Sequence, residues 1–333
     1  MHSRPSIDRR AALTERIKAE AARLGFFSCG VARAEPVKGA DVDHLRRWIG
    51  AGACADMDYM ARNIDKRLNP LLLMPEVKSI VCVALNYTPA QRIPDDEYQI
   101  AYYAYGKDYH DVMKSKLHAL AAAAGIMRYK AFCDTAPVLE RYWAVRAGIG
   151  WIGRNRNLII PNAGSMVFLG ELFVDTELIP GTPMTNRCGT CTACIDACPT
   201  GALAADDASF DAARCLSYQT IENRGALSSN AAKAIGQTIY GCDRCQKACP
   251  WNKHTPPCTE PDLLPDDALL AMRRDDWQTL TEEHWRQLFK GSAVKRAKYE
   301  GLMRNIRAAE DNEKDTSEDN GKDMAEDNEK GAP

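Results

Sequence analysis

Hydrophobic residues near the start of the chain recur at helical spacing. Leu13, Ile17, Ala21 and Leu24 lie three or four positions apart, and a glycine follows them as a helix stop. The apolar run from Phe26 to Ala32 then predicts a strand. The chain is therefore expected to open with a helix followed by a strand.

Helical and extended patterns continue to alternate as far as Val174. They predict helices over about 43–49, 110–124 and 138–147, a buried strand over 79–85, and strand-like runs over 157–160 and 166–174. Such a mixture is typical of helices layered on a sheet. We therefore assign this region to the α/β or α+β class.

The composition then changes. Gly, Pro, Thr and Cys dominate residues 179–202 and 241–257, with a helical stretch over 231–237 between them. Short turns of this composition are typical of chain wrapped around an inorganic core. The pattern becomes helical again towards the C-terminus, where Thr279 or Thr281 is expected to cap a helix.

Residues 309–332 are three tandem octapeptides, AEDNEKDT, SEDNGKDM and AEDNEKGA. They contain almost no apolar residues, which predicts disorder over 309–333. The tail has ten Asp or Glu against three Lys, so it contributes −7 to the net charge of −2 and leaves the rest of the chain near +5. That balance permits a polyanionic partner.

The overall composition is that of a globular protein, because 333 residues with 45% apolar content can bury a sizeable core. We find neither a signal-peptide pattern nor an apolar run long enough to cross a bilayer, and therefore expect a cytoplasmic protein. Thirteen cysteines in a cytoplasmic chain indicate metal binding or redox chemistry in preference to disulfides.

The first cysteine run has the spacing C-x2-C-x2-C-x3-C and is followed by proline. It consists of Cys188, Cys191, Cys194 and Cys198. In bacterial ferredoxins the fourth cysteine of this pattern binds the other of two clusters. Three thiolates at this spacing wrap one face of a cubane, whereas the longer step and the proline turn the fourth away. The run therefore predicts two 4Fe-4S clusters with interlaced ligands.

A second run has the same outline but one thiol fewer, because Ala248 stands where a further cysteine is expected. Interlacing assigns Cys188, Cys191, Cys194 and Cys249 to cluster one, and Cys198, Cys242 and Cys245 to cluster two. The missing ligand must come from elsewhere, and Cys215 and Cys258 are both candidates. Zinc also binds four cysteines, but two interlaced runs that each precede a proline favour iron-sulfur clusters.

Three other patterns receive structural interpretations. Gly148, Gly150 and Gly153 spell G-x-G-x-x-G but follow a helix and precede a strand, the reverse of a dinucleotide site, so we expect tight backbone packing beside Trp151. The sequence D-Y-H-D-V-M around His110 lacks the glycine of the cobalt-histidine motif D-x-H-x-x-G, so His110 is expected to be structural or RNA-facing. The remaining cysteines are expected to be small buried side chains: Cys29, Cys54, Cys82 and Cys133.

Asp134 follows a strand-like run and precedes Thr135, Ala136 and Pro137. It is therefore expected at a strand end that opens toward a helix, where α/β folds place chemistry. A carboxyl group walled by apolar neighbours there would have a raised pKa and would donate a proton. From the sequence alone, a helix-capping aspartate is the commoner explanation of such a residue.

Between Lys290 and Arg307 there are six basic residues against one acid, Glu300. A basic run of this kind holds phosphates in many proteins. The alternative is an ordinary solvated helix face.

Taken together, several segments resemble epoxyqueuosine reductase, the cobalamin-dependent enzyme family that completes queuosine at the wobble position of tRNA. The likeness covers nearly the whole chain ahead of the octapeptides. It is carried by Asp56 to Met60 with Arg62 and Asn63, YGKDYH at 105–110, DTAPVLER at 134–141, AGIGWIGRN at 147–155, GSMVFLGE at 164–171, RCLSYQTIE at 214–222, FKGSAVKRAKYEGLMRN at 289–305 and both cysteine runs.

The resemblance implies a fold class and a domain order. The expected fold is α+β, with a nitroreductase-like cobalamin-binding catalytic domain over 1–178 and a ferredoxin-like domain with two 4Fe-4S clusters over 179–258. A helical segment over 259–308 and a disordered tail over 309–333 complete the chain. It resembles a short form of the family, without the C-terminal HEAT-like repeat that helps many members to hold tRNA.

The resemblance also assigns roles to residues. Cys215 matches the remaining ligand of cluster two, and Asp134 matches the proton donor above the corrin. Cobalamin is expected to be base-off with no histidine on cobalt, which agrees with the broken motif at His110. Further corrin contacts are expected from Met57, Arg141, Asn157, Ser217, Gln219 and Thr220.

The implied reaction removes the epoxide oxygen with two electrons and two protons, leaving an alkene and water. Asp134 would protonate the departing oxygen. The basic residues from Lys295 to Arg307 would hold the anticodon stem-loop, with the modified base turned into the cobalt pocket. An external electron donor is expected, and the protein is expected to be a monomer.

Two other functions stay open from the sequence. A reductive dehalogenase or another small-molecule cobalamin reductase would use the same cofactors. Such dehalogenases usually carry a twin-arginine leader, whereas Arg9 and Arg10 here precede a helix with Glu15 and Glu20. A non-catalytic iron-sulfur electron carrier would leave the N-terminal region and Asp134 without a purpose.

Overall fold

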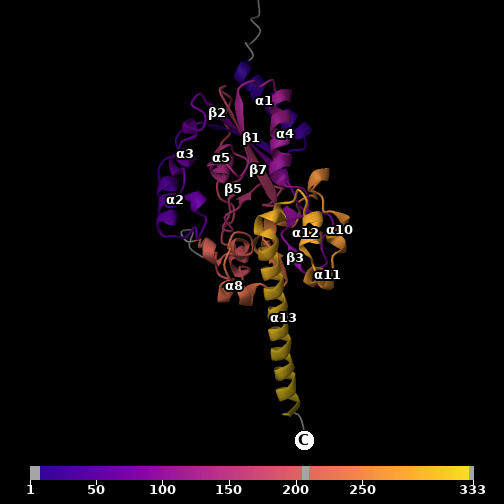
Figure 1. The fold of residues 1–333 in the computed structure, drawn as a ribbon. Coiled ribbons are helices and arrows are strands. Elements are labelled where there is room, and N and C mark those ends of the chain that lie inside the picture. The colour runs from indigo at the N-terminus through magenta and orange to yellow at the C-terminus, as the bar shows by residue number, and fades with distance from the viewer. Residues whose placement is uncertain (1–7, 205–209, 330–333) are drawn as a thin grey trace, which may run out of the picture.

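The structure, a computed structural model, describes residues 8–204 and 210–329. At its centre lies a four-stranded antiparallel sheet with the strand order β1-β2-β7-β4 (Figure 1). The strands are β1 (Ser28–Arg33), β2 (Ser79–Asn86), β7 (Val167–Val174) and β4 (Tyr129–Phe132). The strands predicted over 26–32, 79–85 and 166–174 are confirmed, with small shifts at their ends.

Helices cover both faces of this sheet. They are α1 (Arg9–Arg23) and α4 (Tyr109–Ala123) on one face and α5 (Glu140–Arg146) on the other. Successive side chains of a strand point to opposite faces, so Val81 and Val83 of β2 join the core under α1 and α4, whereas Ile80 and Cys82 join the core under α5. Each fully buried aliphatic side chain contributes roughly 1.5–3 kcal/mol. The sheet is therefore a rigid platform for the loops at its edges.

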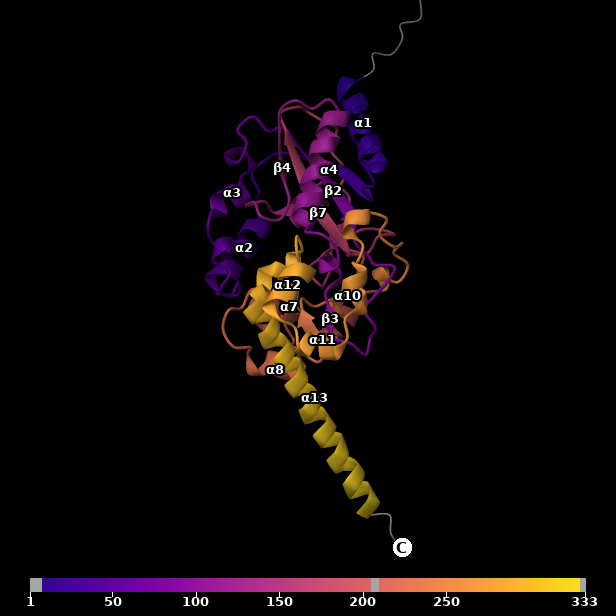
Figure 2. The same ribbon diagram turned by 45° about the vertical axis from the view of Figure 1, so that its right-hand side comes forward.

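The segment between β1 and β2 forms one flank of the molecule (Figures 1 and 2). It contains α2 (Ala40–Gly50), η1 (Asp58–Met60), α3 (Ile64–Leu68) and η2 (Pro70–Leu72). Trp48 Nε1 donates a hydrogen bond to the Phe210 carbonyl oxygen at 2.7 Å, and Ala212 N donates to the Ala53 carbonyl oxygen at 2.9 Å. These bonds attach the flank to the cysteine-rich region.

A short hairpin follows α5, with β5 (Trp151–Ile152) paired to β6 (Leu158–Ile159). A Cβ atom added to Gly150 would stand 2.3 Å from the carbonyl oxygen of Ile159, so only glycine fits there. The prediction of tight backbone packing at the G-x-G-x-x-G pattern is confirmed.

The cysteine-rich region is built from short helices. These are α6 (Ala193–Asp196), η4 (Ala212–Arg214), α7 (Leu216–Ile221), α8 (Ser229–Ala234), α9 (Arg244–Lys247) and η5 (Pro250–Asn252). Its strand β8 (Thr238–Tyr240) pairs in parallel with β3 (Gln99–Ile100), which precedes η3 (Tyr102–Ala104). Asp243 Oδ2 accepts a hydrogen bond from Tyr102 N at 2.7 Å. The N-terminal part of the chain therefore contributes a strand to the part that carries the cysteines.

The C-terminal part is helical. It contains η6 (Pro261–Leu263), α10 (Asp267–Ala271), α11 (Arg274–Gln278), α12 (Glu282–Leu288), η7 (Ala293–Ala297) and α13 (Lys298–Glu329). Thr281 Oγ1 accepts a hydrogen bond from His284 N at 3.2 Å, which confirms Thr281 as the cap of α12. Asn305 Nδ2 donates to the carbonyl oxygens of Thr220 at 2.8 Å and Ile239 at 2.9 Å, and so attaches α13 to α7 and β8.

The octapeptides continue α13, which differs from the disorder predicted over 309–333. Helix α13 extends to Glu329 and leaves the body of the molecule (Figures 1 and 2), and residues 330–333 lie outside the described residues. Starting a helix is unfavourable, but the first half of α13 is already held in place by packing. Further turns can therefore be added at little cost in free energy. Ala309 is still fully buried, and Lys314 pairs with Glu310 one turn earlier at 3.0 Å.

Within residues 8–204 and 210–329, no helix is both long and apolar enough to cross a membrane.

Candidate active site and cluster-binding cysteines

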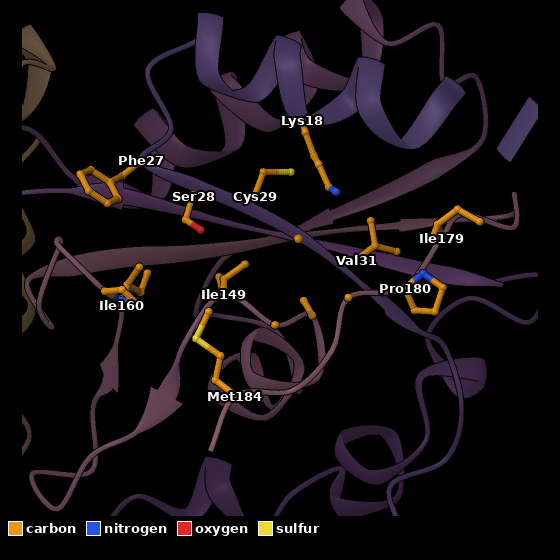
Figure 3. A pocket seen from close by; sticks show the side chains of 15 residues that line it. Lys18, Phe27, Ser28, Cys29, Val31, Ile149, Ile160, Ile179, Pro180 and Met184 are labelled. Carbon is orange, nitrogen blue, oxygen red and sulfur yellow. The ribbon is translucent and has the colours of Figure 1, made fainter. Parts of the chain in front are cut away.

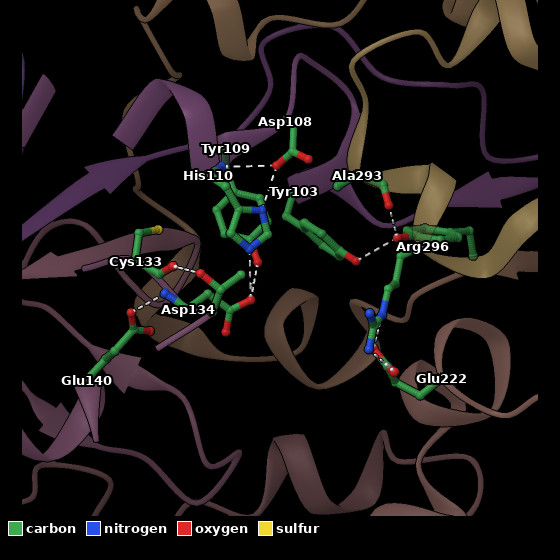
Figure 4. Close-up of polar contacts among 12 residues, drawn as sticks. Tyr103, Asp108, Tyr109, His110, Cys133, Asp134, Glu140, Glu222, Ala293 and Arg296 are labelled. Atoms are coloured by element: carbon green, nitrogen blue, oxygen red, sulfur yellow. Dashed lines mark hydrogen bonds and ion pairs between the residues drawn. The ribbon is translucent and has the colours of Figure 1, made fainter. Parts of the chain in front are cut away.

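Asp134 lies on the turn that connects β4 to α5. Its backbone has a φ of 55°, in the left-handed region that non-glycine residues rarely adopt. Its N–H donates a hydrogen bond of 2.5 Å to Glu140 Oε1, from the first residue of α5 (Figure 4). The side chain of Asp134 is 59% exposed, so the turn presents its carboxylate to an open space.

The start of α4 supplies the partners of this carboxylate. Tyr109 Oη donates to Asp134 Oδ2 at 2.5 Å, and His110 Nε2 lies 3.3 Å from the same oxygen (Figure 4). Asp108 caps α4 by accepting from His110 N at 3.0 Å, and its Oδ1 lies 2.6 Å from His110 Nδ1. The imidazole is thus held between two carboxylates.

This arrangement fixes the charges of the group. Hydrogen bonds from His110 to Asp108 and Asp134 outweigh the effect of burial and raise the pKa of His110 to about 9. Partial enclosure by its neighbours acts to raise the pKa of Asp134, but the hydrogen bonds from His110 and Tyr109 outweigh it and leave that pKa below its ordinary value. At neutral pH the proton therefore resides on His110 and Asp134 is ionised. The raised pKa predicted for Asp134 is wrong, because the sequence did not reveal its cationic neighbour.

The wall opposite Asp134 comes from the C-terminal half of the chain. Arg296 of η7 forms a bidentate ion pair with Glu222 at the end of α7, with Nε–Oε1 and Nη2–Oε2 distances of 2.9 and 2.7 Å (Figure 4). Burial, followed by the negative charges of Glu222 and Asp134, raises the pKa of Tyr59 to about 12. Tyr59 therefore lies near both carboxylates, so elements distant in sequence come together here.

The predicted corrin contacts divide into two groups. Met57, Asn157 and Ser217 are only partly buried, and Arg141 is exposed, with its Nη1 bonded to the Arg156 carbonyl oxygen. Gln219 and Thr220 are instead buried and engaged within the protein. Gln219 Nε2 donates to the Ala213 carbonyl oxygen at 2.6 Å, and Thr220 Oγ1 donates to the Leu216 carbonyl oxygen at 2.7 Å. Their side chains have structural partners of their own.

The predicted cluster ligands fall into two neighbouring groups. Burial raises the pKa of Cys194, and the thiols of Cys249, Cys188 and Cys191 raise it further. Burial likewise raises the pKa of Cys245, and Cys242 and Cys215 raise it further. Cys198 in turn raises the pKa of Cys215. These effects indicate that thiols within each group lie near one another, and Cys194 of the first group also raises the pKa of Cys245 in the second.

Cys215 and Cys258 occupy different surroundings. Cys215 precedes α7, and the N–H groups of Ser217 and Tyr218 point at its sulfur and offset part of the effect of burial on its pKa. The charged groups that act on Cys258 are instead Glu260 and Lys116. The structure therefore favours Cys215 as the fourth thiol of the second set.

The geometry also bears on zinc. Among the described residues, no three His, Cys, Asp or Glu side chains converge on a single metal ion. Four thiolates that each bind a different iron of a cubane stand further apart than four that share one zinc.

The other predicted residues are placed as follows. Cys54, Cys82 and Cys133 are buried, as predicted, whereas Cys29 is only partly buried. Of the six basic residues over 290–307, Arg304 is used internally, because it donates to the carbonyl oxygens of Gln219, Asn223 and Gly225. The residues that remain at the surface are Lys290, Lys295, Arg296, Lys298 and Arg307.

A cavity of about 430 Å³ lies elsewhere, against β1 (Figure 3). Its walls include Lys18, Cys29, Ile149 and Met184, and none of its lining residues is a carboxylate or a histidine. It therefore lacks the acid-base groups that surround Asp134, and we place the candidate active site at Asp134.

Two family models match the chain. One, described as "4Fe-4S double cluster binding domain", matches residues 187–252, and the other, "Epoxyqueuosine reductase QueG, DUF1730", matches residues 67–135. The epoxyqueuosine reductase of Cellulophaga algicola is 42% identical over 87% of this chain and 95% of its own length. The chain belongs to the epoxyqueuosine reductase family. The epoxyqueuosine reductase of Pseudomonas aeruginosa is 38% identical over 89% of this chain and 84% of its own.

Solved structures of epoxyqueuosine reductase share the fold. A crystal structure with an epoxyqueuosine-modified tRNA-Tyr stem loop has a TM-score of 0.80 at 30% identity, over 90% of this chain and 80% of the other. The Bacillus subtilis enzyme, with its catalytic aspartate loop swung out of the active site, has a TM-score of 0.78 at 29% identity, over 90% and 81%. The predicted family, fold class and double-cluster domain are confirmed, and the dehalogenase and electron-carrier alternatives gain no support.

Proposed function

We propose that this protein reduces epoxyqueuosine to queuosine at the wobble position of tRNA, with cobalamin and two 4Fe-4S clusters. The observation that carries the proposal is the Asp108–His110–Asp134 chain. In this chain a protonated histidine stands behind the Asp134 carboxylate, which faces an open space. Glu222, on the opposite side of that space, lies at the end of α7, and Cys215, a proposed cluster ligand, directly precedes α7. Proton delivery and electron delivery thus meet at one place.

The residues around this space suit a corrin, whose rim carries amide side chains. Arg67, which lies near Tyr59 and Asp134, has a buried Nε that no described residue satisfies. His110 is occupied by two carboxylates and is therefore unsuited to bind cobalt. We accordingly propose base-off cobalamin without a protein ligand on cobalt, held by Met57, Arg141, Asn157 and Ser217. When bound, cobalamin supplies the reducing electrons to the epoxide carbon.

The proton follows from the charges. His110 holds it at neutral pH, and Asp134 Oδ2 lies between His110 and the open space. We propose that Asp134 passes this proton to the oxygen that leaves the epoxide carbon, so that no free alkoxide forms. The second proton, which completes water, comes from solvent. Loss of the Asp134 carboxyl would interrupt the path while leaving the corrin contacts in place.

The thiols also indicate a direction for electrons. Cys191 of the first set is exposed, whereas the second set includes Cys215 at the start of α7, whose other end carries Glu222 at the site. We propose that Cys188, Cys191, Cys194 and Cys249 would hold cluster one near the surface that an external electron donor reaches. Cys198, Cys215, Cys242 and Cys245 would hold cluster two nearer the active site, and the two clusters would supply electrons one at a time.

The tRNA would approach over η7 and the start of α13. Lys295, Lys298 and Arg307 are exposed there, beside Arg296 at the edge of the site. Phosphate contacts of this kind position a stem-loop, and the modified base would turn into the space above Asp134.

The test is anaerobic reconstitution with iron, sulfide and cobalamin, followed by incubation with a strong reductant and tRNA that carries epoxyqueuosine. Nucleosides are then measured by mass spectrometry. The wild type should form queuosine, whereas Asp134→Ala should not, although it binds cobalamin to the same extent by visible absorbance. Asp41→Ala, which removes an exposed carboxylate from α2, is the matched control and should retain turnover.

Unchanged epoxyqueuosine with wild-type protein that contains both clusters and corrin would refute the substrate. Full turnover by Asp134→Ala would refute the proton path alone.

A further inference from the structure

Glu171 and Glu140 form a pair of carboxyl groups behind Asp134, on the face of the sheet that α5 covers. Glu171 is on the central strand β7, where it pairs with Cys82 of β2 on one side and Phe132 of β4 on the other. It shares its face of the sheet with Phe173, which belongs to the core under α5. Glu171 is completely buried. A glutamate in the middle of an apolar sheet face requires an explanation.

No described residue donates a hydrogen bond to either carboxyl oxygen of Glu171. The ionisable group that acts most strongly on it is Glu140, at the start of α5. Glu140 is in turn the residue whose Oε1 accepts the backbone N–H of Asp134. The three residues therefore form a line from the core of the sheet to the catalytic turn.

Glu171 is fully buried and Glu140 is partly buried, and two such carboxylates side by side are not both ionised, because burial and mutual repulsion oppose the second charge. Burial, together with the charge of Asp134, raises the pKa of Glu140 to about 7. Burial, together with the neighbouring Glu140, raises the pKa of Glu171 further. Other groups that face the pair are His110, Tyr109, Arg141, Arg67, Cys82 and Cys133.

We propose that Glu171 keeps its proton and donates it in a hydrogen bond to Glu140, and that this acid pair holds the left-handed Asp134 turn in its catalytic position. Glu140 then uses one oxygen for Glu171 and the other for the Asp134 N–H. Glu171 touches no substrate and is a positioning residue. An aspartate keeps a left-handed backbone conformation only where the surrounding structure holds it there, and this pair of carboxyl groups provides that support.

The effect on turnover rests on the proposed function, whereas the effect on the turn does not. Hydrogen exchange of backbone amides over 133–138 in the reconstituted protein reports the turn directly, without tRNA. Glu171→Leu should speed this exchange by about tenfold or more, because the support of Glu140 is lost. Glu140→Ala should do the same, since it removes the acceptor itself.

Glu171→Gln separates the acid pair from simple packing, because its amide still donates a hydrogen bond but does not ionise. A group whose pKa is raised on folding stabilises the folded state at low pH and loses that effect as pH rises through the raised value. The wild-type turn should therefore become less protected from neutral to alkaline pH, after correction for intrinsic exchange, and Glu171→Gln should remove most of that change. His110 titrates equally in both proteins and cancels in the comparison.

Phe173→Leu is the matched control, because it leaves a small cavity in the same core two residues further along β7 without changing the carboxyl groups. Equal exchange over 133–138 in Phe173→Leu and Glu171→Leu would overturn the proposal, as would an unaltered pH dependence in Glu171→Gln. If Glu171→Leu does not fold, Glu171→Gln and Glu140→Ala still decide. In turnover, Glu171→Leu should lower kcat for the modified stem-loop and leave KM unchanged. A wild type without turnover would refute the substrate while the exchange data still judge the pair.

Discussion

At the scale of single residues, the proton held by His110 determines how the site responds to pH. The pKa of His110 is raised to about 9 by hydrogen bonds to Asp108 and Asp134, so its stabilising effect is complete below the ordinary value near 6.5 and is lost as pH rises towards 9. We expect turnover of the wild type to fall as pH rises through about 9, because the site then has no proton to give.

His110→Gln tests this prediction. The amide retains hydrogen bonding but holds no titrating proton, so turnover should fall about 10²-fold or more and the alkaline decline should disappear. The measurement is the rate of queuosine formation against pH under single turnover. An unchanged pH profile in His110→Gln would show that another group supplies the proton.

The two candidate thiols give a second prediction at this scale. Cys215→Ser should remove one ligand of cluster two, so reconstituted protein should contain about four irons per chain where the wild type contains about eight. Cys258→Ser is the control, because Cys258 lies outside both thiol groups, and it should keep the full iron content. Iron and sulfide analysis and the electron paramagnetic resonance of the reduced protein distinguish the two. Full iron content in Cys215→Ser would require a different fourth ligand.

The sequence could predict chemistry that resides in a local pattern, but not charges that come from a distance. Most of the proposed cluster ligands were predicted from spacing, and the proposed roles of Cys215 and Asp134 from short matching segments. The low pKa of Asp134 depends on Tyr109 and His110, which reach it from α4 across the end of the sheet. Arg296 and Glu222 were missed as a pair for the same reason, since they come from η7 and α7.

At the scale of elements, α13 joins the C-terminal segment to the cluster region. Asn305→Ala should leave the buried carbonyl groups of Thr220 and Ile239 without a donor, and so lower the free energy of unfolding by roughly 2–4 kcal/mol. Urea unfolding of the reconstituted protein measures this. Arg307→Ala, an exposed change on the same helix, should cost less than about 0.5 kcal/mol. If both variants lost a similar amount of unfolding free energy, the Asn305 hydrogen bonds would not be what attaches α13 to the cluster region.

Helices and strands could be predicted where they are long enough for the spacing of their apolar residues to repeat. The long runs of α1, α4, β2 and β7 were found because each buries a face over many residues. Strands β3, β5 and β8 are only two or three residues long and carry no usable period, so they were missed. The helical octapeptides were missed because their order derives from the packed helix before them.

At the scale of the whole molecule, the charge of α13 opposes that of the basic surface at its start. Removal of residues 315–333 deletes seven acids and two lysines. We expect the shortened protein to bind the modified stem-loop several-fold more tightly at low salt, and the gain to vanish above roughly 0.5 M salt, where such charges are screened. Fluorescence anisotropy against salt concentration measures this. A full-length chain with those acids changed to Asn and Gln should behave like the shortened one, and a difference between the two would point to length instead of charge.

Protein made without its iron-sulfur clusters would lose more than the ability to transfer electrons. β8 ends two residues before Cys242 and is the partner of β3, while Asp243 holds the backbone of Tyr102. If no cluster fixes Cys242, both attachments loosen, and a segment from the middle of the catalytic half is released to proteases. Iron supply would then set the lifetime of the protein in the cell as well as its activity.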